Sequence, residues 1–205
     1  MVDPASLLIC GAFEGEIDKF SKYKNINVLN SGIGSYDSMF NLMSHLLRNR
    51  NIRSVIFTGS AGAYPHSELS IGDFVCSNAF FYREVAEIKA MAKVPSKLNR
   101  NIITQKDPEL VELFAPCVNS GTNSLNYITL VDLQLPECID YLFDVGVENM
   151  EAFGLAYIAY KFSVPFTAFY YITNYVGSEG SNDWAANWRE GSDALQDHII
   201  KSLHL

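Results

Sequence analysis

Several features that would point to a secreted, membrane or metal-binding protein are missing from this chain of 205 residues. Its four cysteines lie far apart and lack the spacing of metal or redox motifs, so we expect reduced cysteines in the core. The N-terminus lacks the basic start of a signal peptide, and the longest apolar stretch, residues 152–172, is interrupted by Lys161 and Pro165. We therefore expect a soluble cytoplasmic protein.

Positive charge is also scarce. The 15 Lys and Arg residues stand against 23 Asp and Glu residues, so the net charge is −8. An acidic surface repels phosphate backbones, which argues against a nucleic-acid partner. The four histidines form no cluster with one another or with cysteine, so we expect neither a metal site nor a cofactor.

Short apolar runs alternate with longer amphipathic segments along most of the chain. The apolar runs predict strands at residues 7–12, 26–29, 54–58, 74–81, 125–130 and 166–172. Helical spacing predicts helices at residues 36–47, 136–143, 152–162 and from Trp184 to the end. Residues 83–116 carry no clear pattern. Strands and helices that alternate within one domain favour a three-layer α/β fold.

Ligands in such folds bind in loops beyond the strand ends. Three predicted loops lie there, at residues 13–16, 59–62 and 173–177. The first contains Glu14 and Glu16, and a carboxylate that is partly desolvated at such a place is suited to act as a general base. A solvated acidic turn explains the same two residues.

The other candidate residues each have a structural explanation beside the functional one. The run Gly59-Ser60-Ala61-Gly62 offers open backbone N–H groups and a hydroxyl, but it matches neither a P-loop nor a dinucleotide fingerprint. Glu151, at the start of a predicted helix, could cap the helix or accept hydrogen bonds from two ribose hydroxyls, with Met150 under the sugar ring. Asn174 could close an Asx-turn or contact a ring N–H and an exocyclic oxygen of a base.

The order of these segments along the chain is more specific than any one of them. Six segments carry it, at residues 11–16, 31–34, 58–62, 148–152, 164–166 and 172–174. In this order they resemble the nucleoside phosphorylase/nucleosidase family, whose members cleave the N-glycosidic bond of nucleosides with phosphate or water. The resemblance implies one domain over residues 1–205, with a mixed central β-sheet flanked by helices. It also implies a purine nucleoside as the small-molecule partner, and a homodimer or larger homo-oligomer.

The resemblance implies roles for particular residues as well. Glu16 matches the base that activates water, and Asn174 stands where the purine is contacted. The substrate-binding residues that it implies are Ser60, Ala61, Gly62, Met150, Glu151 and Val176. An aromatic side chain is expected to stack on the purine, and Tyr127 is our choice, with Phe80 and Phe81 as alternatives.

Three positions differ from other branches of this family. Thr58 replaces the phosphate-binding Arg of hexameric phosphorylases, which favours water as the nucleophile. Asn174 replaces the Asp that protonates the purine in adenine-specific members. Asn suits a 6-oxopurine, a preference that futalosine hydrolases share. Tyr170 replaces an Arg that helps to hold the nucleophilic water.

We therefore predict hydrolysis of a 6-oxopurine nucleoside, with futalosine as the named candidate, hypoxanthine as the released base and a place in menaquinone formation. A purine nucleoside phosphorylase and a methylthioadenosine/S-adenosylhomocysteine nucleosidase are alternatives within the family. A nucleoside-binding protein without catalysis is the alternative outside the enzymes, because Tyr170 removes one group around the water. An α/β domain without a ligand would require four motif positions to agree by accident.

Overall fold

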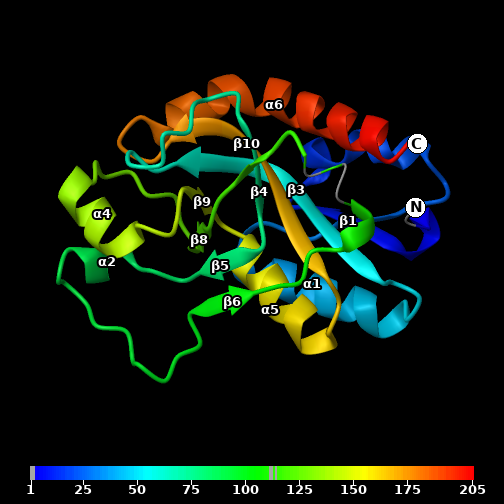
Figure 1. The fold of residues 1–205 in the computed structure, drawn as a ribbon, viewed down its shortest axis with the longest axis horizontal. Helices are drawn as coiled ribbons and strands as arrows, with labels where there is room; N and C mark the ends of the chain where they lie inside the picture. The colour runs from blue at the N-terminus through cyan, green and yellow to red at the C-terminus, as the bar shows by residue number, and fades with distance from the viewer. Residues whose placement is uncertain (1–2, 111–112, 114) are drawn as a thin grey trace.

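The computed structural model describes residues 3–110, 113 and 115–205. A ten-stranded mixed β-sheet forms its centre, and helices cover both faces (Figure 1). The strands are β1 (Leu7–Gly11), β2 (Asn27–Asn30), β3 (Ser54–Ala63), β4 (Phe74–Ser77), β5 (Ala79–Phe81), β6 (Asn101–Ile103), β7 (Val118–Asn119), β8 (Thr122–Ser124), β9 (Val147–Asn149) and β10 (Phe166–Tyr175). The α-helices are α1 (Gly34–Arg48), α2 (Val85–Ile88), α4 (Leu135–Leu142), α5 (Ala152–Phe162) and α6 (Gly180–Ser202). Four 3-10 helices in the described residues are η1 (Pro4–Ser6), η2 (Glu14–Glu16), η3 (Asp18–Lys22) and η4 (Pro108–Leu110).

The layers follow from the alternation of side chains along the strands. Leu8 and Cys10 of β1 join the core that α1 and α5 cover. Leu7 and Ile9 point to the opposite face and join the core that α6 covers. Figure 1 shows this arrangement, with α6 on one side of the sheet and α1 and α5 on the other. The structure confirms the three-layer α/β fold.

Strand β3 lies at the centre of the sheet and has strands on both edges. Parallel β10 covers one edge along the length of β3, from Val55 to Ala63. Parallel β1 covers the other edge only as far as Phe57, and antiparallel β9 begins on that edge at Gly62. Because β1 stops before β9 starts, one edge of β3 has no strand partner over residues 58–61.

Local sequence explains where the helices near this opening begin and end. Gly32, before α1, and Gly34, its first residue, have φ angles of 87° and 80°, a left-handed conformation that glycine adopts without steric cost. Helix α5 ends at Phe162, because Ser163 adopts a left-handed conformation and Pro165 follows. The predicted helix at residues 152–162 is confirmed with the same bounds.

Several predicted segments differ from the structure. Residues 59–62 are not a loop but belong to β3, because β10 pairs with them in spite of the glycines. Likewise, residues 173–175 continue β10, and α6 begins at Gly180 rather than at Trp184. The predicted strand at residues 74–81 is two strands, since β4 pairs with β10 and β5 pairs with β6 and β8.

The predicted strand at residues 125–130 is also wrong. The strand at this place is the preceding polar segment β8, which lies between β5 and β9 and is fully buried. Tyr127 and Ile128, by contrast, are 39% and 46% exposed in a loop, so their apolar character does not reflect a place in the sheet. Residues 83–110, which had no predicted pattern, contain the short elements α2, β6 and η4.

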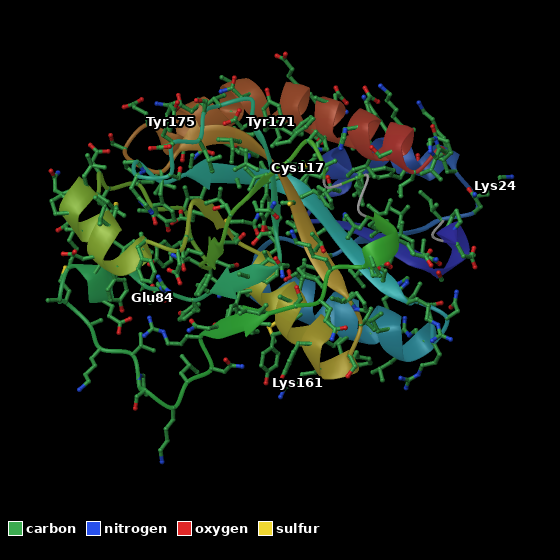
Figure 2. The ribbon with its side chains drawn as sticks, in the orientation of Figure 1. Lys24, Glu84, Cys117, Lys161, Tyr171 and Tyr175 are labelled. Carbon is green, nitrogen blue, oxygen red and sulfur yellow. The ribbon has the colours of Figure 1, made fainter. Side chains whose placement is uncertain are left out.

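All four cysteines are buried and free, which confirms the expectation of reduced core cysteines. Figure 2 shows Cys117 within the molecule, whereas the side chains of Lys24 and Lys161 lie at its periphery. In the part of the chain that the structure describes, no helix combines the length and the apolar character that crossing a bilayer requires.

Candidate active site

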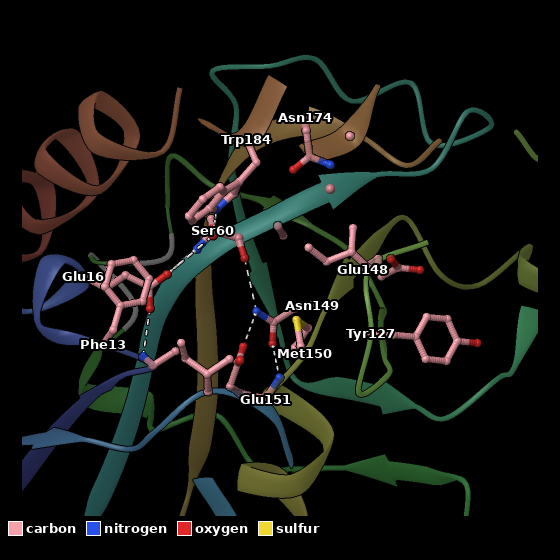
Figure 3. A pocket seen from close by; sticks show the side chains of 16 residues that line it. Phe13, Glu16, Ser60, Tyr127, Glu148, Asn149, Met150, Glu151, Asn174 and Trp184 are labelled. Atoms are coloured by element: carbon pink, nitrogen blue, oxygen red, sulfur yellow. Dashed lines mark hydrogen bonds between the residues drawn. The ribbon is translucent and has the colours of Figure 1, made fainter. Parts of the chain in front are cut away.

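A cavity of about 490 Å³ opens beside β3, on the edge that β1 and β9 leave uncovered. Its volume lies within the range of small-molecule sites. Figure 3 shows the residues around it, which come from both ends and the middle of the chain. The lining consists of Ala12, Phe13, Glu16, Ile33, Ser60, Ala61, Gly62, Tyr127, Ile128, Glu148, Asn149, Met150, Glu151, Asn174, Gly180 and Trp184.

Two side chains bind the open edge of β3 in place of a strand. The N–H of Ser60 donates to Glu16 Oε1 at 3.1 Å, and the carbonyl of Ser60 accepts a hydrogen bond from Asn149 Nδ2 at 3.1 Å. Buried backbone groups need partners, and here polar side chains supply them. The interruption of the sheet therefore brings a carboxylate and an amide to the wall of the cavity.

Glu16 is the carboxylate on this edge, and it is only 4% exposed. Besides Ser60 N–H, it accepts the N–H of Ala12 at 2.8 Å, and Ser60 Oγ lies 3.5 Å away. Burial and the nearby charge of Glu151 raise the pKa of Glu16 to about 8, although these hydrogen bonds oppose the shift. Glu14, two residues earlier, is exposed. A solvated acidic turn therefore explains Glu14, which is exposed, but not Glu16, which is buried.

The 3-10 helix η2 that carries Glu16 is held by α6. The carbonyl of Gly15 accepts hydrogen bonds from Ser192 Oγ at 2.7 Å, Arg189 Nη1 at 3.2 Å and Gln196 Nε2 at 3.3 Å. A side chain at position 15 would come within 2.8 Å of Phe13 and Trp188. The backbone next to Glu16 is therefore fixed from the C-terminal helix.

Glu151 lies opposite, at the start of α5, and is also 4% exposed. It accepts the N–H of Gly34 at 2.8 Å and Asn149 Nδ2 at 3.0 Å. Burial raises the pKa of its carboxyl group. Asn149 in turn accepts the N–H groups of Glu151 and Ala152 through Oδ1, each at 2.9 Å. The helix-cap role that we considered for Glu151 therefore belongs to Asn149, and the Glu151 carboxylate faces the cavity.

Asn174 reaches the cavity from β10 through an irregularity in the strand. Pairing with β3 runs from Ile172 opposite Ala61 to Asn174 opposite Gly62, so Thr173 is an extra residue. Such bulges redirect side chains. The amide oxygen of Asn174 accepts from Thr173 Oγ1 at 2.8 Å and its Nδ2 donates to the carbonyl of Tyr175 at 3.0 Å. These bonds use one donor and one acceptor site, and an amide has a second of each for a ligand.

The remaining predicted binding residues differ in their position. Ser60, Ala61, Gly62 and Met150 line the cavity. Val176 does not: it is 5% exposed and packs in the cluster near α4.

Among the aromatic candidates, Tyr127 is in the cavity lining, but its hydroxyl donates to Glu84 and its ring points away from Glu16 and Asn174 in Figure 3. Phe80 and Phe81 are buried outside the lining. The other aromatic side chains in the lining are Phe13 and Trp184.

Sequence reasoning missed several lining residues, of which Phe13, Glu148, Asn149 and Trp184 carry aromatic or polar groups. Glu148 is 7% exposed and accepts three hydrogen bonds, from Tyr64 Oη at 2.8 Å, Thr129 Oγ1 at 2.7 Å and Thr129 N at 2.9 Å. It therefore fixes the loop that carries Tyr127. Adjacency to Met150 and Glu151 was the signal available for Glu148 and Asn149, whereas Trp184 was recognised only as part of an amphipathic face.

Thr58 and Tyr170, the two other positions that differ from family patterns, are buried in the sheet. The Tyr170 hydroxyl accepts a hydrogen bond from Thr122 Oγ1 at 3.2 Å, and burial raises its pKa far above the ordinary value. Tyr170 is not among the residues that line the cavity. Within residues 3–110, 113 and 115–205, no group of His, Cys, Asp and Glu side chains is arranged to hold a metal ion.

Comparison with known proteins finds similar sequences. A family model described as the phosphorylase superfamily matches residues 12–112. The 5'-methylthioadenosine/S-adenosylhomocysteine nucleosidase of Bacillus licheniformis is 28% identical over 193 residues, which cover 90% of this chain and 83% of that protein. The nucleosidase of the same name from Psychromonas ingrahamii is 28% identical over 209 residues, covering 95% and 87%.

Solved structures share the fold. The Helicobacter pylori 5'-methylthioadenosine/S-adenosylhomocysteine nucleosidase, solved as a mutant with 5'-methylthioadenosine in the active site, has a TM-score of 0.80 at 16% identity, with 98% of each chain covered. The futalosine hydrolase of the same organism also has a TM-score of 0.80 at 16% identity, again over 98% of each chain. The matching family model and the curated relatives make this chain similar to the nucleoside phosphorylase/nucleosidase family, and the solved structures share its fold.

Proposed function

We propose that this protein hydrolyses the N-glycosidic bond of a 6-oxopurine nucleoside, with futalosine as the first candidate. The observation that carries the proposal is that Glu16, Glu151 and Asn174 line one cavity although they lie far apart in the sequence. Glycosidic cleavage needs a group that activates water, a negative charge near the sugar and a partner for the leaving base. Each of the three side chains supplies one of these.

The reaction passes through a state with positive charge on the sugar and electrons moving into the base. Glu16 takes a proton from water as the water oxygen bonds to the anomeric carbon and the bond to the base nitrogen breaks. Glu151 accepts hydrogen bonds from the ribose hydroxyls, and its negative charge stabilises the cationic ring. Asn174 hydrogen-bonds the departing purine, which takes up a proton from solvent as it leaves, and Glu16 then releases its proton to solvent.

The raised pKa of Glu16 suits this role. A general base works best when its pKa is close to the working pH, and a value of about 8 makes the carboxylate more basic than an exposed one. Positive charge developing on the sugar would favour the ionised forms of both Glu16 and Glu151. The two buried carboxylates are thus stabilised most strongly in the transition state, which is the condition for catalysis.

Water is proposed as the nucleophile because of Thr58. This residue is 1% exposed and neutral, and it stands where hexameric phosphorylases carry their phosphate-binding Arg. Tyr170 supplies no positive charge in place of the other family Arg. In its ionised form, the form that acts as the general base, Glu16 favours water over an anion beside it.

The assay that tests the proposal measures free base released from futalosine, inosine, adenosine and methylthioadenosine, each with and without phosphate. We expect a 6-oxopurine from futalosine or inosine, at a rate that phosphate does not change. Turnover of adenine substrates alone would contradict the role of Asn174. Strict dependence on phosphate would identify a phosphorylase, and tight binding without release of base would identify a binding protein.

A methylthioadenosine/S-adenosylhomocysteine nucleosidase is the second candidate. It is favoured by the two relatives described above, which carry that name and align over 90% and 95% of this chain. Both candidate functions use Glu16 as the general base and the same contacts to the ribose. They differ at the purine, so the adenine and 6-oxopurine arms of the assay decide between them.

A further inference from the structure

Trp184 makes a polar contact inside the cavity that the proposed mechanism does not use. It lies in the first turns of α6, and its indole N–H donates to Ser60 Oγ at 3.1 Å. Ser60 Oγ is in turn 3.5 Å from Glu16 Oε1 (Figure 3). The three side chains therefore form a continuous row from α6 through β3 to η2.

The direction of hydrogen bonding in this row follows from the donor types. An indole N–H can only donate, so Ser60 Oγ must be the acceptor in the contact with Trp184. The hydroxyl retains one proton, and Glu16 Oε1 is the acceptor within its reach. Without the indole donor, the hydroxyl could rotate and direct that proton elsewhere.

We propose that Trp184 is a positioning residue for hydrolysis, whose indole N–H orients the Ser60 hydroxyl so that its proton points to Glu16. Glu16 then has three donors, the N–H groups of Ala12 and Ser60 and this hydroxyl. Together they fix the carboxylate toward β3 and leave its remaining lone pairs for water.

The packing around Trp184 holds the indole in place. Its ring stacks on Trp188 with centroids 5.7 Å apart and 15° between the planes. Trp188 meets Phe13 edge to face at 5.3 Å, and Phe13 belongs to the same segment as Glu16. The stack connects α6 to the segment that carries Glu16, so the indole of Trp184 and the carboxylate of Glu16 keep their relative positions.

Other charged groups around Glu16 have to be separated from the effect of Trp184. Glu151 at the start of α5 and Glu148 of β9 line the same cavity, and Glu14 on η2 itself is exposed. On the side of α6 and η3, the charged residues form ion pairs with one another: Arg189 with Asp18 and Asp193, and Lys19 with Asp193 and Asp197. Substitution of Glu16 itself is therefore part of the test.

The first test is kinetic and rests on the proposed function. In Trp184→Phe, which keeps an aromatic ring at this position, the acidic limb of the pH profile of kcat/KM should move up by roughly half a pH unit, because the ionised form of Glu16 loses a donor. Ser60→Ala should move it in the same direction, and the double variant should move it no further than Ser60→Ala alone. Trp188→Phe, which keeps the Trp184 N–H and still offers an aromatic ring for Trp184 to stack on, is the control and should retain the wild-type limb.

The second test needs no turnover. The chain has two tryptophans, so two indole N–H resonances are expected, and Trp188→Phe identifies that of Trp184. Its chemical shift should change with pH, with a midpoint near the pKa of Glu16, about 8. The change should disappear in Glu16→Gln and in Ser60→Ala.

The outcomes are distinguishable. An indole resonance that does not titrate, or that titrates unchanged in Glu16→Gln, overturns the proposal, as does an acidic limb that stays in place in Trp184→Phe. A pH-dependent indole resonance in a protein that hydrolyses no nucleoside supports the contacts between Trp184, Ser60 and Glu16 and rejects the proposed function instead.

Discussion

At the scale of single residues, burial separates side chains that the sequence presents as equivalent. Glu14 and Glu16 are two positions apart and carry the same group, yet Glu14 is exposed and Glu16 is 4% exposed with its carboxylate on β3. The pKa of Glu16 is raised to about 8 by burial first and by the charge of Glu151 second. The chemistry assigned to Glu16 thus depends on its surroundings more than on its residue type.

Replacement of Glu16, the proposed general base, should remove most of the activity. In Glu16→Gln, the amide cannot take a proton from water, and we expect kcat to fall roughly 10²–10⁴-fold while KM changes little. Steady-state kinetics on the substrate found in the base-release assay measures both. Glu14→Gln is the matched control, and a comparable loss there would contradict the assignment.

The same substitution should change the dependence of stability on pH. The folded protein keeps a proton on Glu16 up to about pH 8, whereas a free Glu releases it near 4.5. Between these values the folded state binds more protons than the unfolded state, so stability falls as pH rises, by at most about 1.4 kcal/mol per pH unit from this group. Thermal unfolding across this window should show a smaller decline for Glu16→Gln than for wild type. Equal slopes would show that Glu16 does not retain its proton.

Asn174 should control the choice of base. In Asn174→Asp, the amide becomes a carboxyl group, and the carbonyl of Tyr175 beside it disfavours the ionised form. A protonated acid can donate to an adenine ring nitrogen, so the ratio of kcat/KM for adenosine to that for inosine should rise at least about tenfold. Competition between the two substrates measures it, and an unchanged ratio would mean that position 174 does not contact the base.

At the scale of elements, the site depends on where strands stop rather than on where they run. The end of β1 and the start of β9 leave residues 58–61 of β3 without a strand on one edge, and the bulge in β10 places Asn174 beside Gly62. Hydrophobic patterns predicted β1, α1, α5 and most of β10, because these elements bury regular apolar faces. They did not predict residues 59–62 as strand or β8 as strand, because glycine and short polar segments enter a sheet only through their partners.

Gly62 tests this arrangement. A Cβ there would lie 2.7 Å from Asn174 Nδ2 and 3.1 Å from Val176, so Gly62→Ala should displace Asn174 and cost about 1–3 kcal/mol of stability. Activity should fall further than the loss of stability explains. Gly72→Ala is a useful control, since its φ of 103° also disfavours alanine but its Cβ would meet only Tyr171 Oη at 3.7 Å. Urea unfolding and turnover of both variants separate the two effects.

At the scale of the whole molecule, one exposed apolar patch lies next to the cavity. Tyr36 and Phe40, one turn apart on α1, are 80% and 64% exposed, and Ile33 before them reaches the cavity lining at 62% exposed. Ser35 N–H donates to Asn126, which sets the exposed loop of Tyr127 beside this helix. Monomeric proteins seldom leave such patches uncovered.

We therefore expect this face to be covered by a second copy of the chain. Sedimentation should give at least twice the chain mass of 22.9 kDa, and Phe40→Asp should shift the protein toward the monomer. Ile103→Asp, which changes an apolar side chain of similar exposure (72%) on β6, should not. Monomer mass at high concentration would reject the expectation.

The order of apolar runs, glycine turns and acidic or amide residues was sufficient to identify the layers, the family resemblance and three of the groups that meet in the cavity. These features are local, and each depends on residues within a few positions of one another. Contacts between distant segments decided the rest, such as the burial of Glu16 and the hydrogen bond from Trp184 to Ser60, which are 124 positions apart. Which carboxylate is desolvated, which edge of a strand stays open and which aromatic ring reaches the site depend on the packing of whole elements, and no short sequence window contains that information.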